Sequence, residues 1–353
     1  MPKRSDVLAR FSAEWPTAPR GYLNAASIGL PPRRTAEALR AALDAWATGA
    51  VSAPDYDPSV QRARELYAAL VGVAAPWVAV VPQVSVAMGL VAASLPDGAE
   101  VVCPLGDFSS VVFPFLVHAD RGVRVRHVPP EALADEVRPG TTLVAFSLVQ
   151  SADGSVTDAA AVCEAAARVG ATTCCDLTQA VGWLPVDAGA FDVSVCGGYK
   201  WLCQPRGTAY LTVTPGAAER IRPVHAGWYA GDSRWDSTYG PEMHLAPDAR
   251  RFDVSPAWLS WVGAVPALEL LSEIGVDAVH AHDVGLADRL RERLGLSPAG
   301  RAVVALPDPD GGAAAALRAA GCAVATRAGN VRLGMHTWNT EADVELAARA
   351  LGR

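Results

Sequence analysis

Residues Thr173 to Tyr210 read TCCDLTQAVGWLPVDAGAFDVSVCGGYKWLCQPRGTAY, and they contain two short apolar runs, each followed by a residue capable of acid–base chemistry. The first run ends at Asp176, with Gln179 three residues later. The second run leads through Gly-Gly-Tyr to Lys200. Apolar runs of this length, bounded by turn residues, predict buried strands. Side chains at the carboxyl ends of such strands lie at the ligand-binding edge of the sheet, so the sequence predicts an acid and an amine at one edge.

An acid and an amine in this arrangement are what a pyridoxal phosphate (PLP) site requires. The amine of Lys200 would bind the cofactor's aldehyde as an imine, Asp176 would hold the pyridine nitrogen protonated, and Gln179 would hydrogen-bond the phenolic oxygen. Lys200 is the only lysine after Lys3, whereas every other Lys or Arg position is arginine, which cannot lose a proton and attack a carbonyl. The alternatives are a solvent-facing lysine on a loop, a helix-capping aspartate and a surface glutamine.

The composition excludes several classes of protein. The 353 residues are 51% hydrophobic and 19% charged, which allows a sizeable core, and a net charge of -7 gives nucleic acid no general reason to bind. Residues 66–96 carry no charge, but proline and polar residues divide them below the length of a membrane span. The N-terminus lacks the apolar run of a signal peptide, and seven cysteines occur without a CxxC pair. We therefore expect a cytoplasmic protein with reduced thiols, no metal site, and no nucleic-acid or membrane partner.

Short apolar runs alternate with alanine-rich helical segments through most of the chain, which predicts an α/β fold with a mainly parallel, seven-stranded sheet between helices. The expected strands are 78–81, 101–103, 123–128, 143–148, 172–175, 193–196 and 209–213. A long helix at 258–274 and a smaller α/β unit follow. We expect an N-terminal arm and helix at 1–50 that join the small domain, a large cofactor-binding domain at 51–256, and a linking helix with a small C-terminal domain at 257–353.

Further residues are predicted to bind the cofactor's phosphate and ring and the substrate's carboxylate. Val84 and Ser85 open a helix after the strand at 78–81, so their N–H groups and the Ser85 hydroxyl would face the cofactor phosphate, aided by the phenol of Tyr199. Phe108 follows the next strand and could stack on the pyridine ring, or belong to the core. Arg332 lies in an apolar late strand and could bind the substrate's carboxylate, although an internal salt bridge is the alternative.

The pattern resembles the class V aminotransferase family of fold-type I PLP enzymes, which includes cysteine desulfurases, kynureninase and isopenicillin N epimerase. The resemblance covers nearly the whole chain and is carried by Asp-x-x-Gln at 176–179, Lys200, the segment Tyr-Leu-Asn-Ala-Ala-Ser at 22–27, Arg-Phe-Asp-Val-Ser-Pro at 251–256, and Arg332 with the Trp-Asn-Thr-Glu that follows it at 338–341.

The resemblance implies a homodimer with its active sites at the interface. Ser255 would then contact the partner subunit's cofactor, while Asn24 and Ser151 would lie near the substrate. In the family's cysteine desulfurases a cysteine-bearing loop precedes the late arginine, but here Arg327-Ala328-Gly329 runs almost directly into Arg332. The residue before the lysine is Tyr199, as in kynureninase, and the predicted stacking residue also resembles kynureninase. We therefore do not expect a persulfide-forming cysteine.

The resemblance and the residues together predict an enzyme that acts on an amino acid through a Cα carbanion. We expect a lyase that eliminates a Cβ substituent by cleaving a C–S or C–C bond, with transamination and then epimerisation as alternatives. A degenerate fold that binds a ligand without chemistry is the non-enzyme alternative. A nucleotide-binding doubly wound protein is disfavoured because no strand is followed by GxGxxG or a P-loop.

Overall fold

The computed structural model describes residues 13–353, so residues 1–12 of the expected N-terminal arm lie outside the described part. Its main element is a seven-stranded sheet in the order β1-β7-β6-β5-β4-β2-β3. Neighbours from β6 to β3 are parallel, and β7 runs antiparallel to both β6 and β1. The strands of this large sheet are β1 (Val78–Val81), β2 (Glu100–Pro104), β3 (Arg124–Val128), β4 (Thr141–Ser147), β5 (Thr172–Asp176), β6 (Val193–Gly197) and β7 (Ala209–Val213). The predicted fold class and all seven strands are confirmed.

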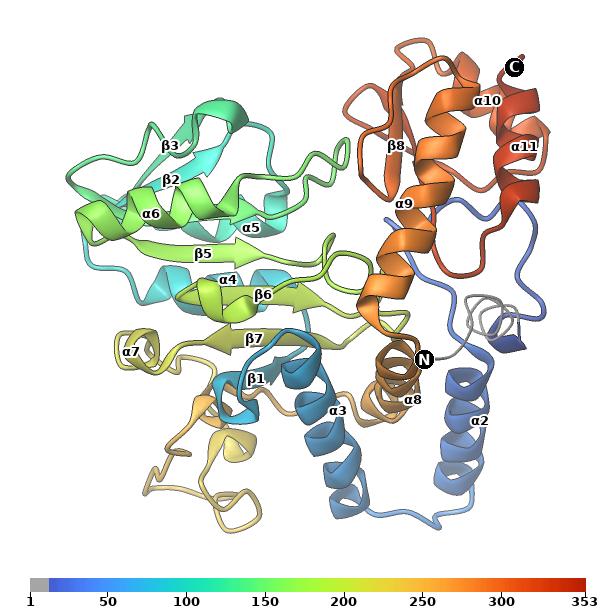
Figure 1. Ribbon diagram of the computed structural model, residues 1–353. Helices are drawn as coiled ribbons and strands as arrows, with labels where there is room; N and C mark the ends of the chain where they lie inside the picture. Colours follow the sequence, from blue (N-terminus) through green and yellow to red (C-terminus); the bar gives the residue numbers. More distant parts are fainter. Residues whose placement is uncertain (1–12) are drawn as a thin grey trace.

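Helices cover both faces of the large sheet, because its central strands are apolar on both sides. Alternate residues of β1 illustrate this: Val78 and Val80 join the core on one face, and Ala79 and Val81 the core on the other. The first face packs against α3 (Asp57–Leu70), α6 (Ala159–Val169) and α8 (Trp258–Ile274), and the second against α4 (Val84–Ala93) and α5 (Ser109–Leu116). In Figure 1 α6 lies in front of the sheet and α4 lies behind it. The uncharged stretch at 66–96 is thus part of two helices and a buried strand, and no helix in the described part is long and apolar enough to cross a membrane.

A second, three-stranded antiparallel sheet has the order β8-β10-β9. Its strands are β8 (Val303–Pro307), β9 (Ala325–Arg327) and β10 (Asn330–Gly334), and the helices beside it are α9 (Val276–Arg293), α10 (Gly312–Ala319) and α11 (Glu341–Ala350). A capping box begins α11, in which Thr340 and Asp343 satisfy each other's backbone N–H groups, as the sequence at 340–343 predicts. The helix α2 (Arg33–Ala47) packs against α8, and the short α7 (Pro215–Ala218) follows β7.

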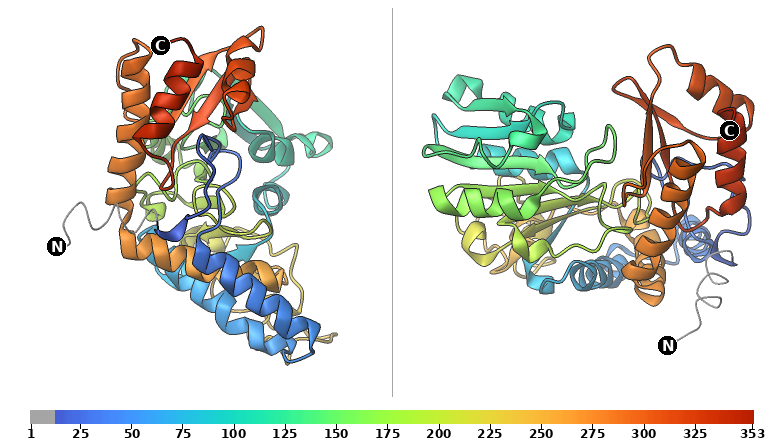
Figure 2. Two further views of the ribbon diagram at one scale, coloured as in Figure 1. Left: turned by 90° about the vertical axis from the view of Figure 1, so that its right-hand side faces the viewer. Right: turned by 45° about the horizontal axis from the view of Figure 1, so that its top comes forward.

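The N-terminal arm connects the two sheets. Asn24 of the arm forms a β-bridge with Gly334 at the end of β10. Gly29 of the arm donates its N–H to the carbonyl of Tyr199, the residue before Lys200, at 3.0 Å. Figure 2 shows this arm, in dark blue, passing between the two units. The arrowheads of β5 and β6 point toward it and toward α9 in Figure 1. The carboxyl ends of the parallel strands therefore face the arm and the small sheet. The proposed division into segments 1–50, 51–256 and 257–353 remains a prediction.

Candidate active site

Lys200 and Asp176 lie at the carboxyl edge of the large sheet, where the sequence places them. Asp176 is the last residue of β5, and Lys200 follows β6, the neighbouring parallel strand. Both side chains are buried, with 5% of each exposed. Burial lowers the pKa of Lys200 to about 8; the carboxylate of Asp176 opposes this, and the guanidinium groups of Arg332 and Arg327 add to it. An amine with this pKa is partly neutral near pH 7 to 8 and can act as a nucleophile or a base.

Asp176 is held in place by its own loop. Its Oδ1 accepts the backbone N–H of Thr178 at 2.9 Å. Burial raises the pKa of Asp176, while the bonds from Thr178 and the charge of Lys200 oppose the rise. A second cation beside this carboxylate, such as a protonated pyridine, would offset the cost of burying its charge.

Two aromatic rings flank the amine. The Nζ atom of Lys200 lies 5.3 Å from the ring centre of Phe108 and 5.7 Å from that of Tyr199. Phe108 precedes α5 and is 38% exposed, so its ring is not part of the core. The guanidinium of Arg206 lies 5.1 Å from the ring centre of Tyr199. An aromatic ring beside the amine fits a planar cofactor, and stacking of Phe108 remains a proposal.

Arg332 is 2% exposed and points from β10 toward the arm. Among the residues that the structure describes, its hydrogen-bond partners are all uncharged oxygens: the carbonyl and hydroxyl of Ser151, the carbonyl of Ala26 and the hydroxyl of Ser27. Burial, with the nearby charge of Arg327, lowers the pKa of Arg332 to about 10. Its Nε atom is buried without a partner. A buried guanidinium held by neutral groups favours an anion, and the carboxylate of an amino acid is one.

Gln179 is engaged with protein atoms rather than directed at open space. Its Nε2 donates to the carbonyl of Ala26 at 2.9 Å and to the hydroxyl of Ser151 at 3.3 Å, and its Oε1 accepts from the indole of Trp201 at 2.8 Å. A contact to the cofactor's phenolic oxygen therefore requires one of these bonds, most readily the longer one to Ser151, to be exchanged. That contact remains a prediction.

The predicted phosphate cradle lies at the start of α4. Gln83 has extended backbone angles and ends the preceding loop, and its carbonyl accepts the N–H groups of Val86 and Ala87. The N–H groups of Val84 and Ser85 precede the first bond of the helix and point away from it, so they are free to bind an anion. Asn24 lies beside Gly334, close to Arg332, and its Oδ1 is buried without a partner.

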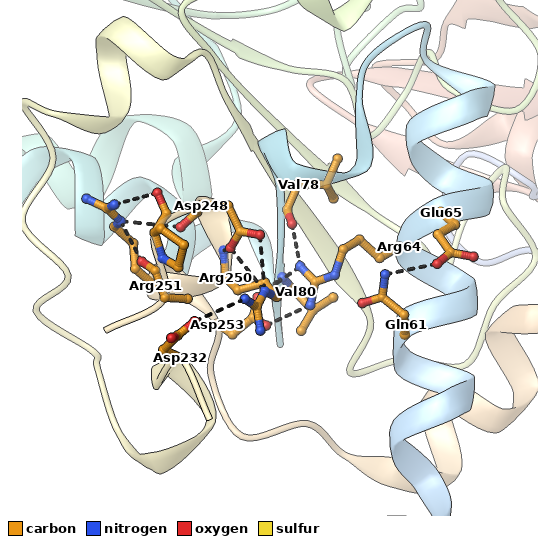
Figure 3. Close-up of polar contacts among 12 residues, drawn as sticks. Gln61, Arg64, Glu65, Val78, Val80, Asp232, Asp248, Arg250, Arg251 and Asp253 are labelled. Carbon is orange, nitrogen blue, oxygen red and sulfur yellow. Dashed lines mark hydrogen bonds and ion pairs between the residues drawn. The ribbon is translucent and has the colours of Figure 1, made fainter. Parts of the chain in front are cut away.

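Ser255 is exposed and is not brought together with Lys200 within this chain. The segment that precedes it binds the edge strand β1: Val254 donates its N–H to the carbonyl of Val80, and Asp253 accepts the N–H of Val80 at 2.8 Å. Figure 3 shows Asp253 between β1 and the guanidinium of Arg64. This arrangement is compatible with the expected contact to a partner subunit, which remains a proposal.

The structure adds charged residues that the sequence reasoning did not identify. Residues directly opposite each other in an antiparallel pair share a face, so Arg327, opposite Asn330, projects from the same face of the small sheet as Arg332. Asp107 accepts from both the backbone N–H and the hydroxyl of Ser147, at the end of β4. Arg327 stands five residues before Arg332, and Arg206 six residues after Lys200, but neither had a spacing that marked it as part of the site.

The donor set fits pyridoxal phosphate. A buried amine of lowered pKa, a buried carboxylate, an exposed aromatic ring and a helix N-terminus correspond to the aldehyde, pyridine nitrogen, ring face and phosphate of the cofactor. The unpartnered polar atoms of Asn24 and Arg332 are available to the substrate beside it.

Comparison with known proteins agrees with this chemistry. Residues 55–317 match the family model described as aminotransferase class-V, and the chain therefore belongs to this family. The uncharacterized aminotransferase YcbU of Bacillus subtilis is 32% identical over 230 residues, covering 62% of this chain and 60% of that protein. Isopenicillin N epimerase of Amycolatopsis lactamdurans is 28% identical over 373 residues, covering 93% of this chain and 94% of that protein. Cysteine desulfurases and a kynureninase are also among the relatives.

A solved structure of C-DES with glycine covalently linked to its PLP cofactor has the same fold, with a TM-score of 0.85, 20% identity and 99% of both chains covered. The family match and this shared fold confirm the predicted aminotransferase class-V family, and the donor set described above fits pyridoxal phosphate as the cofactor.

Proposed function

We propose that the enzyme is a lyase that cleaves a C–S or C–C bond at Cβ of an amino acid through a Cα carbanion. The observation that carries the carbanion chemistry is the position of Lys200: its buried amine, with a pKa of about 8, lies in the electrostatic field of Asp176 and 5.3 Å from the ring of Phe108. When bound, pyridoxal phosphate supplies an aldehyde that captures the substrate's amino group and a ring that accepts the electron pair left at Cα.

Each residue has a defined part in the proposed reaction. Arg332 binds the substrate's carboxylate, because its guanidinium is buried among neutral oxygens. Lys200 takes the proton from Cα as a neutral amine and then, as an ammonium group, can hand that proton to the group leaving Cβ. Asp176 would hold the pyridine nitrogen of the bound cofactor, and its negative charge would favour protonation there.

The hairpin between β9 and β10 argues against a cysteine desulfurase. Arg327 pairs with Asn330, so only Ala328 and Gly329 form the turn, and both have positive φ angles of 46° and 75°. Such a turn has no room for a cysteine-bearing loop. Cys322 precedes β9 and is buried, and burial raises its pKa, which disfavours the thiolate that a sulfur-accepting nucleophile requires.

Aminotransferase and epimerase are the competing activities. The B. subtilis relative is named an aminotransferase, and the alignment with the Amycolatopsis epimerase spans nearly both chains. We favour the lyase because Tyr199 and Phe108, the two rings beside Lys200, match the resemblance to kynureninase seen in the sequence, and a kynureninase is among the relatives.

The proposal is tested by following candidate substrates by NMR in D₂O with the PLP-loaded enzyme. L-Cystine, S-methyl-L-cysteine and L-kynurenine probe the lyase, L-alanine with 2-oxoglutarate probes transamination, and loss of optical activity probes epimerisation. A lyase releases pyruvate or alanine with the leaving group and needs no amino acceptor. Sustained amino transfer to 2-oxoglutarate, or racemisation, without Cβ cleavage would refute it. Lys200→Ala is the control for background reaction of free cofactor.

We also propose that the enzyme is a homodimer. Ser255 is exposed, and several large apolar side chains on and near α5 are exposed as well: Leu105 at 66%, Phe113 at 61% and Val117 at 71%. Apolar groups gathered in this way are typical of protein interfaces. Sedimentation equilibrium tests the proposal, and a monomer at micromolar concentration would contradict it.

A further inference from the structure

A buried ion pair in the C-terminal unit reaches the loop that carries Lys200. Asp283 on α9 and His336, which follows β10, have no exposed surface. The Nδ1 of His336 lies 2.7 Å from a carboxylate oxygen of Asp283. The Nε2 on the other side of the ring lies 2.9 Å from the backbone carbonyl of Trp201, the residue after Lys200. The imidazole therefore bridges the C-terminal unit and the catalytic loop of the large sheet.

The surroundings favour a charged imidazole that donates from both nitrogens. Burial of the ring lowers the pKa of His336, but the carboxylate of Asp283 outweighs this, and the pKa is about 10. The thiol of Cys203 also lies beside the ring. His282, the residue before Asp283 on α9, is a further electrostatic neighbour of that carboxylate. With both nitrogens protonated, one N–H is fixed by the carboxylate and the other is directed at the carbonyl of Trp201.

Trp201 has little freedom to move independently of this bond. Its carbonyl lies so close to Gly182 that a Cβ added there would be 2.6 Å from the carbonyl oxygen. Its indole N–H donates to Gln179, which in turn bonds the hydroxyl of Ser151, a partner of Arg332. One short chain of contacts thus joins His336, the residue after Lys200, and the predicted cofactor and substrate residues.

The other side of Lys200 is held by the N-terminal arm. Gly29 donates its N–H to the carbonyl of Tyr199 at 3.0 Å, and it packs so closely that an added Cβ would fall 2.0 Å from the carbonyl oxygen of Lys200. The peptide before Lys200 is thus bonded to the arm, and the carbonyl of the next residue, Trp201, is bonded to His336, so the backbone of Lys200 is restrained on both sides.

We propose that Asp283 and His336 are positioning residues for Lys200: the pair holds the carbonyl of Trp201 and thereby makes the position of the catalytic amine depend on how the C-terminal unit is seated on the large sheet. The pair touches neither substrate nor cofactor and acts through the backbone. A purely structural role would require only that the pair stabilise the fold. A positioning role depends on the bond from His336 to the carbonyl of Trp201, whereas a structural role depends equally or more on the bond between His336 and Asp283.

Two substitutions separate the halves of the bridge. The amide of His336→Asn ends near the position of Nδ1, so it keeps a donor for Asp283 and leaves the carbonyl of Trp201 without one. The amide of His336→Gln ends near the position of Nε2, so it keeps the donor for Trp201 and leaves Asp283 without a partner. Both variants lose the positive charge. Val344→Ala, on α11 in the core of the C-terminal unit, is the control for a loss of stability that does not touch this bridge.

The readouts are the rate at which PLP attaches to Lys200 of the apoenzyme, followed by visible absorbance, and the free energy of unfolding in urea. Because small misplacements of a reacting group are costly, we expect His336→Asn to slow attachment on the order of 10- to 100-fold, and His336→Gln and Val344→Ala to change it by less than about threefold. A structural role predicts equal effects of the two His336 variants, or a larger effect of His336→Gln. Either of those results, or normal attachment in a folded His336→Asn, would overturn the proposal.

Native-state hydrogen exchange of the wild-type holoenzyme provides a second test that needs no variant to fold. If the pair couples the two units, the amides of Trp201 to Cys203 and those of His336 to Asn339 open together, with one free energy and one dependence on denaturant. Independent opening of the two segments would refute the coupling.

Discussion

Replacing Arg64 or Asp253 tests how the chain fixes the segment that leads to Ser255. The guanidinium of Arg64 on α3 lies 2.7 Å from the carboxylate of Asp253, and their side chains are 1% and 0% exposed. Arg64 also donates to the carbonyl of Val78, and Asp253 accepts the N–H of Val80, so the pair joins α3, β1 and the segment at 249–254 (Figure 3). The same view shows Arg250 bonded to Asp248. Both side chains are partly exposed, and such a pair contributes less to the free energy of unfolding than a buried one.

The expected magnitude follows from burial. Arg64→Met leaves the carboxylate of Asp253 without its counter-ion, and Asp253→Asn leaves the guanidinium of Arg64 without its own. Because an uncompensated buried charge is costly, each single variant should lose about 3 to 5 kcal/mol of the free energy of unfolding. The double variant contains no buried charge, and the amide oxygen at position 253 can still accept the N–H of Val80. It should therefore be more stable than either single variant.

The pH dependence gives the sign of the electrostatic effect. Burial raises the pKa of Asp253, and the charge of Arg64 opposes the rise. Without Arg64 the folded-state pKa must rise further above the unfolded value of about 3.9, so the folded state binds a proton more readily than the unfolded state. The stability lost in Arg64→Met should consequently be smaller at pH 5 than at pH 8.

Urea denaturation of the four apoproteins, at both pH values, measures these free energies, and equal slopes with denaturant concentration check that one transition is being compared. Arg62→Met, on the same helix as Arg64, removes an exposed pair with Glu269 on α8; it is the matched control and should cost about 1 kcal/mol or less. A double variant that loses as much as the two single variants together would refute the electrostatic reasoning. So would a loss in Arg64→Met that grows as the pH falls.

Three further predictions concern the site. Asp176→Asn should slow the exchange of the Cα hydrogen of bound amino acids, measured by NMR in D₂O, on the order of 100-fold, because a neutral amide does not stabilise the protonated ring. Arg327→Gln removes a cation that lowers the pKa of Lys200, so the pH midpoint for attachment of PLP to the apoenzyme should move upward from about 8; Arg318→Gln on α10 should leave it unchanged. Arg332→Lys keeps the charge but loses the planar pair of donors, so spectral titration should show glycine binding weakened about tenfold or more. Unchanged exchange, midpoint or affinity, respectively, would contradict each prediction.

The periodic apolar runs were sufficient to predict the large sheet, because most of its strands are buried on both faces and are bounded by turn residues; the edge strand β3, which exposes Arg124 and His127, is the exception. Val193 to Cys196, for example, is buried on both sides of the sheet and could be recognised without its neighbours. Asp176 and Lys200 could be predicted as a pair because Asp176 ends one such strand and Lys200 lies three residues after another. The limits of helices were less certain where a capping group lies inside the apolar pattern, as with Asp158, whose side chain caps α6 by accepting the N–H of Ala161.

The contacts that join distant segments could not be read from local patterns. Asp283 and His336 lie 53 residues apart, and neither stands in a recognisable motif. Arg64 lies between Arg62 and Glu65, which are both exposed, and nothing in its spacing distinguishes it. The partners of Gln179 come from the arm, from Ser151 and from Trp201, so its bonds depend on the packing of three segments.

The central claim is that Lys200 is the residue to which pyridoxal phosphate binds covalently. The chain contains only Lys3 and Lys200, so the site can be assigned without ambiguity. The holoenzyme is reduced with borohydride, digested with trypsin and analysed by mass spectrometry. We predict that cleavage after Lys200 is lost and that the peptide spanning 169–206 carries the mass of the reduced cofactor. A label on Lys3 alone, or no label on a protein that binds the cofactor, would contradict the account.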